Sequence, residues 1–237
     1  MIDITFDYRL DCKKGTDPDK NSKRLKSDHC FLWSKKIPNL NGELIFYVDN
    51  KVICANINGI IRTFSPDSIT NCFTYWDKTK SLRENEEIKQ LIDLYNSIDY
   101  TIGSSIIFPV HDVDLSSKWT INKARGCSRK ICDRIDYTLE CIRLYYLDKN
   151  IKTPLQSCFI KYDFFFELFG SFENYVKFFL LDDLVSRDYK SVLSFTGSID
   201  FNNPYPNEFN YSEYIKNNID FINKRNERIA CYIRNLI

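Results

Sequence analysis

Residues between positions 120 and 146 combine positive and negative side chains at spacings that could do chemistry. A guanidinium donates forked, charge-assisted hydrogen bonds to a phosphate, so clustered arginines can bind an anion. A carboxylate beside such a site could act as a general base or hold a ribose hydroxyl. We therefore predict an anion-binding site here, with the candidate catalysts Asp136 and Glu140 and the candidate ligand-binding residues Asn122, Arg125, Arg129, Arg134 and Arg143.

The helix that would position these groups follows from hydrophobic periodicity. Apolar side chains form one stripe at helical spacing, at Ile131, Ile135, Leu139, Ile142 and Tyr146. Asp136, Glu140 and Arg143 lie away from the stripe and should face water or another element. Arg134 lies at its margin. Because an unpaired buried charge is costly, Arg134 must meet either a carboxylate of the protein or an anionic ligand.

The basic loop before this helix favours the ligand. Gly126 permits unusual backbone angles, and the first N–H groups of a helix are free to meet an anion. The alternative is an exposed basic loop, with Asp133, Asp136 and Glu140 as ordinary surface partners of neighbouring Lys and Arg side chains.

This stretch reads TIN-x-ARG and then I-x-DR-x-D-x-TLECIR, a pattern that resembles a bacterial family known only as a domain of unknown function. The stretches LWSK at 32–35 and YTIG-x-x-IIFP at 100–109 are similar to the same family, so the resemblance covers nearly the whole chain. The resemblance indicates which residues could form a site, but it does not indicate which reaction they would perform. The positions that it adds to those above are His29, Trp33 and Lys35. His111 stands where the family pattern would have a short glycine-containing turn, which argues against a catalytic role for it.

The segment around Trp33 allows two interpretations. In one, Lys35 lies beside the ligand and His29 is a candidate acid or base near it. In the other, Trp33 anchors the loop in the core and the lysines remain solvated.

Composition limits the classes of function. The formal net charge of the 237 residues is +1, so no overall basic field attracts nucleic acid, and any such contact would need a local patch. The nine cysteines include no C-x-x-C pair, which predicts free thiols in a reducing cytoplasm. No signal peptide or membrane span is expected. A structural zinc site is not expected either, no cofactor is indicated, and a magnesium site of carboxylates stays open.

The first half of the chain, residues 1–119, has mainly strand patterns. We predict a strand at 4–9, a loop at 11–28, a three-stranded meander from Glu43 to Phe64 broken at 65–68, and a strand at 104–109. One amphipathic helix, at 85–98, interrupts them.

The second half, residues 120–237, is predicted to be helical. After Thr153-Pro154 we expect helices at 155–169, at 171–185 and from Ser212 onward, with Lys224, Arg225 and Arg228 on the exposed side of the last one and a short strand at 192–195. The prediction is an α+β fold, in one domain, with a mainly antiparallel N-terminal half packed against a helical C-terminal half.

Three functions fit these features. The first is an enzyme that acts on a nucleotide, a nucleotide-derived cofactor or an RNA end, a role that would suit a toxin or phage-defence effector. No P-loop, dinucleotide-binding or catalytic-triad motif supports it. The second is a non-catalytic sensor of a phosphorylated ligand. The third is a structural protein in which Arg125, Arg134 and Glu140 form an internal salt-bridge network between the halves.

Overall fold

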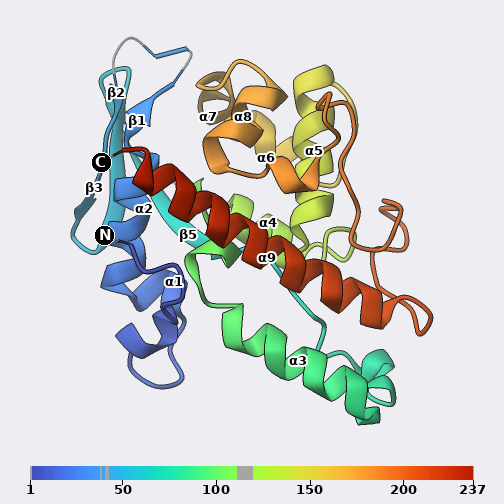
Figure 1. Cartoon of the computed structure of the whole chain (residues 1–237). Coiled ribbons are helices and arrows are strands. Elements are labelled where there is room, and N and C mark those ends of the chain that lie inside the picture. The colour runs from blue at the N-terminus through green and yellow to red at the C-terminus, as the bar shows by residue number, and fades with distance from the viewer. Residues whose placement is uncertain (1, 38, 41–42, 111–119, 237) are drawn as a thin grey trace.

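The computed structural model describes residues 2–37, 39–40, 43–110 and 120–236. Its strands lie between residues 35 and 110, and helices occupy most of residues 121–234, so the fold is α+β as predicted. The long helix α9 (Tyr211–Arg234) crosses the front of the molecule, and α3 (Glu86–Ile98) runs below it (Figure 1). Near the C-terminal end of α9, the Tyr232 ring lies 4.4 Å from the ammonium of Lys35 in strand β1 (Lys35–Lys36). The loop that contains His111 lies outside the described residues.

The predicted meander is confirmed. Strands β3 (Phe46–Asp49), β4 (Val52–Ile57), β5 (Ile60–Ser68) and β6 (Ser105–Val110) form an antiparallel sheet in that order. Both hairpin turns have two consecutive residues with positive φ, Asn50-Lys51 and Asn58-Gly59, which the right-handed strand twist favours. Strands β1 (Lys35–Lys36) and β2 (Glu43–Leu44) form a separate pair.

The prediction ended this strand at Phe64 with a break at 65–68, but β5 continues through Pro66 to Ser68. Its pairing with β4 stops at Phe64, whereas Pro66 pairs with Ile107 of β6. Proline is tolerated there because β5 has a neighbour on one side only, so the missing N–H interrupts no second ladder. This extension places Asp67 where the helical half can reach it.

The N-terminal predictions were wrong. Residues 4–9 form a turn and the 3-10 helix η1 (Tyr8–Asp11), not a strand, and the expected loop contains helices α1 (Pro18–Asn21) and α2 (Lys23–Trp33). Asp17 caps α1 with Pro18 at its first position, and Ser22 caps α2 by accepting from the N–H of Leu25. Helix α2 packs on the sheet through a buried face that its polar composition concealed.

The helical half differs from the prediction in its boundaries. The expected basic loop contains helix α4 (Ile121–Cys127), with Gly126 inside it, and α5 begins later than predicted, at Ile135 (Ile135–Leu147). The helix predicted at 155–169 is divided into two helices, α6 (Gln156–Lys161) and α7 (Asp163–Glu167). Helix α8 (Phe172–Phe179) is followed by Leu180, whose positive φ ends it earlier than predicted. The predicted strand at 192–195 is a single bridge between Val185 and Val192.

Arg225 was predicted to be exposed but is fully buried on α9. Its guanidinium donates to the carbonyl oxygens of Phe179, Gly103 and Ser105. The carbonyls at a helix end have no partner within the helix, and they carry the negative end of its dipole, so a cation is stabilised there without a carboxylate. Arg225 thereby ties α9 to the end of α8 and to η4 (Ile102–Ser104).

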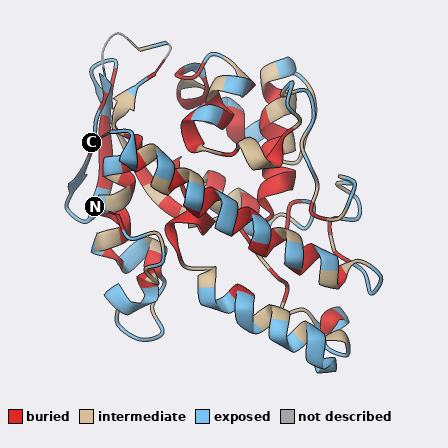
Figure 2. Cartoon of the chain, viewed as in Figure 1, coloured by how far each residue is buried: buried red, intermediate tan, exposed pale blue. Residues whose placement is uncertain are grey.

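The core runs through both halves. Buried side chains from α2, the sheet, α5 to α8 and α9 form one contiguous cluster, and the buried residues of these elements are red in Figure 2. All nine cysteines are free thiols. Among the described helices, none is both long enough and apolar enough to cross a bilayer.

Candidate functional site

Arg125 lies on α4 and is fully buried. Its guanidinium forms an ion pair with Asp67 of β5 and donates to the carbonyl of Asp133 at 3.1 Å, and its Nε donates to Thr138 Oγ1 at 2.9 Å. The Asp133 carboxylate lies 3.2 Å from the same guanidinium. Because its donors are directed at protein acceptors, Arg125 cannot bind a ligand without losing these contacts.

Three carboxylates, those of Asp67, Asp133 and Asp19, interact electrostatically with the Arg125 guanidinium. Burial and the neighbouring Asp17 and Asp133 raise the pKa of Asp19 to about 7, and burial raises the pKa of Asp133 against the opposing pull of Arg125. Asp19 accepts from the N–H of Ser68 at 3.0 Å. Cys132 and Asp133 both have positive φ, a backbone conformation that side chains disfavour, so contacts such as the one with Arg125 hold this turn in place.

Arg134 immediately precedes α5 and pairs with Asp136 in a fully buried, bidentate interaction. Asp136 also accepts from the N–H of Phe195 at 2.9 Å, and Arg134 donates to the carbonyl of Pro204 and to Thr196. The pair joins α5 to the loop before α9. Of the two partners expected for Arg134, a carboxylate of the protein or an anionic ligand, the structure shows the carboxylate, and its other acceptors also come from the protein.

His29 is fully buried on α2. Its Nδ1 accepts from Trp33 Nε1 at 2.9 Å, so Nε2 carries the proton and donates to Ser105 Oγ, also at 2.9 Å. Burial, with a smaller effect of Arg225, lowers the pKa of His29 to about 3. A neutral imidazole with both nitrogens occupied has no atom left for a reacting group.

Lys35 and Asn122 are also used by the fold. The ammonium of Lys35 donates to the carbonyl of Phe178 at 2.9 Å and lies 4.4 Å from the rings of Phe178 and Tyr232. Burial lowers its pKa to about 8. The side-chain amide of Asn122 donates to the carbonyl of Pro66 in β5 at 3.1 Å.

Glu140 and Arg143 pair with each other one turn apart on α5, through two bonds of 2.7 Å. Both are partly exposed. The pair is of the kind that stabilises a helix surface.

Arg129 differs from the other predicted arginines because it is exposed and lines an open hollow of about 610 Å³. We name it the Arg129 hollow, and its described lining residues are Trp76, Lys78, Arg129, Lys130, Phe201, Asn202 and Tyr205. Among these residues are three cations, three aromatic rings and no carboxylate. No described acid forms an ion pair with Lys78, Arg129 or Lys130.

Three distant segments build this hollow. Trp76 precedes the 3-10 helix η2 (Asp77–Thr79), Arg129 follows α4, and Tyr205 belongs to the loop before α9. The rings of Trp76 and Tyr205 stack at 4.3 Å between centroids and 21° between planes. Asn71 links the segments by donating to the carbonyl of Cys132 at 3.1 Å. The stack is therefore part of a packed surface.

The charge of Arg129 acts electrostatically on the Tyr205 hydroxyl of this stack. A hydrogen bond with Cys132, and burial, raise the pKa of the Tyr205 hydroxyl to about 12, while Arg129 opposes the shift. The ammonium of Lys78 lies 5.2 Å from the Trp76 ring. The hollow thus offers flat rings beside cations, the combination that binds a planar, phosphorylated molecule.

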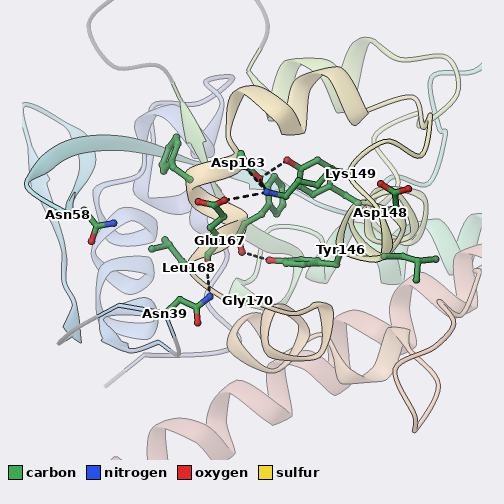
Figure 3. Close-up of a pocket in the computed structure, with 13 residues that line it drawn as sticks. Asn39, Asn58, Tyr146, Asp148, Lys149, Asp163, Glu167, Leu168 and Gly170 are labelled. Atoms are coloured by element: carbon green, nitrogen blue, oxygen red, sulfur yellow. Dashed lines mark hydrogen bonds and ion pairs between the residues drawn. The ribbon is translucent and has the colours of Figure 1, made fainter.

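A second hollow, of about 650 Å³, lies where α5 and α7 meet the N-terminal half (Figure 3). Lys149 is held between Asp163 and Glu167 at 2.7 and 3.3 Å, and Tyr145 donates to Asp163 at 2.7 Å. With Asp148 also in its lining, acids outnumber cations, so this hollow does not suit a phosphate. No three described His, Cys, Asp or Glu side chains gather as a metal site would require.

Among the predicted residues, Arg129 alone lies in the Arg129 hollow. Sequence reasoning missed Trp76, Lys78, Phe201 and Tyr205. An aromatic-basic run, YWDK at 75–78, was the available signal, but nothing local connects it to Arg129.

A family of unknown function (DUF6994) matches residues 2–229. No curated protein and no solved structure matches the chain.

Proposed function

Since the chain belongs to the family of unknown function DUF6994, we propose a function from the geometry of the site: the protein binds a nucleotide or the end of an RNA strand in the Arg129 hollow. The observation that carries the proposal is the Trp76–Tyr205 stack beside three cations that no described acid neutralises. Bases stack on aromatic side chains, and phosphates pair with Arg and Lys.

Binding without catalysis fits this geometry better than an enzyme. The candidate catalysts His29, Asp136 and Glu140 are each occupied by other contacts of the fold. None of them lines the Arg129 hollow. The protein would then act as a sensor or carrier of a phosphorylated ligand.

The structural hypothesis applies to the remaining arginines. Arg125 connects α4 to β5, and Arg134 connects α5 to the loop at 194–204. We propose that these two pairs stabilise the junction of the halves while Arg129 serves the ligand.

The test is a titration of a fluorescein-labelled RNA hexamer, followed by anisotropy, with the intact protein and two matched double variants. Arg129→Gln/Lys130→Gln should weaken binding at least about tenfold, the loss of one charge-assisted phosphate contact or more. Lys13→Gln/Lys14→Gln removes the same charge from another exposed pair and should bind like the unaltered protein. Equal affinity of both variants, or no binding by any protein, would reject the proposal.

A further inference from the structure

A smaller hollow shares part of its lining with the Arg129 hollow. This Phe209 hollow, of about 340 Å³, is lined by Trp76, Lys78, Leu82, Asn203, Tyr205, Pro206, Asn207, Glu208 and Phe209. Trp76, Lys78 and Tyr205 line both hollows. One aromatic stack and one cation therefore border both hollows.

Phe209 is the most exposed large apolar residue described, at 90 %. Phe209 lies in a turn that hydrogen bonds hold in place. Asn207 accepts from the N–H of Phe209 at 2.9 Å, and Asn210 accepts from the N–H of Asn207 at 2.8 Å, which closes the turn just before α9. An exposed ring held in a defined turn beside a hollow is available to stack with a ligand.

We infer that the ligand is a single-stranded oligonucleotide of two or more nucleotides, with one base in the Arg129 hollow and the next in the Phe209 hollow. This inference rests on the proposed function and extends it from a nucleotide to a strand. Single strands are bound by successive stacked bases along a basic groove. Lys78 lies at the shared boundary, where the phosphate between the two nucleosides would pass.

Charge separates the roles of the two spaces. Arg129 and Lys130 line the Arg129 hollow but not the Phe209 hollow. The Phe209 hollow has Glu208 and an apolar wall of Leu82 and Pro206. The terminal phosphate would therefore lie in the Arg129 hollow, and the Phe209 hollow would contribute base stacking more than charge.

The experiment compares adenosine 5′-monophosphate with 5′-phosphorylated ribo- and deoxyribo-dinucleotides by calorimetry. The dinucleotide should bind about 5 to 150 times more tightly, the gain from stacking one further base. Phe209→Ala should remove that gain and leave binding of the mononucleotide unchanged. Phe31→Ala removes another exposed phenyl ring, on α2, and should have no effect. A gain with either dinucleotide supports the inference and identifies the sugar.

The two levels of the proposal fail differently. If the mononucleotide and both dinucleotides bind equally tightly, or if Phe209→Ala leaves the gain intact, the strand inference is wrong while the Arg129 hollow stands. If none of the three binds, the proposed function itself is wrong.

Discussion

Arg125 of α4 and Asp67 of β5 form an ion pair across the junction of the two halves, 58 residues apart in sequence. The pair depends on β5 continuing past Pro66, because Asp67 would otherwise not lie under α4. It explains why an arginine that looks like a ligand-binding residue is fully buried.

Arg125→Met should destabilise the protein strongly, because Asp67 and Asp133 would be left without their cation. Breaking a buried pair by removing one partner costs about 3–5 kcal/mol, whereas an exposed pair contributes about 1 kcal/mol or less. The free energy of unfolding in urea measures the loss. Arg143→Met, which breaks the partly exposed pair with Glu140, is the matched control. Similar losses for the two variants would contradict the structural role of Arg125.

Arg134 and Asp136 should be energetically coupled. Arg134→Met and Asp136→Asn should each cost about 3 kcal/mol, and the double variant should cost at least about 1 kcal/mol less than the sum. Asparagine keeps an oxygen that can accept from Phe195, so the cycle isolates the charge pair. Urea unfolding of the four proteins provides the cycle. Additive losses would mean that the two side chains act independently.

His29 should stay neutral far below the usual range of histidine. Burial lowers its pKa from 6.5 to about 3, and the Trp33 N–H fixes Nδ1 as the unprotonated nitrogen. As the pH falls below about 6.5, the unfolded chain binds a proton that the folded chain does not, so stability decreases. Nitrogen-15 NMR of a His111→Asn variant, which leaves one histidine, should show the Nε2–H tautomer down to about pH 4. Titration near pH 6.5 would contradict this environment.

Asp19 should have the opposite effect. Its pKa rises from 3.8 to about 7 in the folded protein, so between these values the folded chain keeps a proton that the unfolded chain releases. Stability then decreases as the pH rises through this window. Asp19→Asn should flatten that decrease and make the protein more stable than the unaltered chain above pH 7, as measured by urea unfolding from pH 4.5 to 8. Parallel profiles would show that Asp19 titrates normally.

Local signals predicted the elements whose stabilisation is local. Helix α3 followed from its apolar spacing, and the meander followed from alternation and the Asn58-Gly59 turn. Helix α2 was missed because its exposed face is strongly polar and its buried face includes His29 and Lys26. Residue type and spacing did not identify the helix in that segment.

The partners of the arginines could not be predicted. Arg125 pairs with an aspartate in a strand, and the charge of Arg225 is stabilised by hydrogen bonds to backbone carbonyls, which no side-chain pattern records. The stack of Trp76 on Tyr205 arises only when α9 and its preceding loop dock. When a site is assembled from distant segments, no single segment contains enough of its residues to predict the site from sequence.

The most direct test of the account is the salt dependence of RNA hexamer binding. Each phosphate neutralised on a single strand contributes about −0.7 to the slope of log affinity against log salt concentration. Three cations in the Arg129 hollow predict a slope of about −2 for the unaltered protein and a slope near zero for Lys78→Gln/Arg129→Gln/Lys130→Gln. If the triple variant keeps both the affinity and the slope of the unaltered protein, the ligand does not bind in this hollow and the account is wrong.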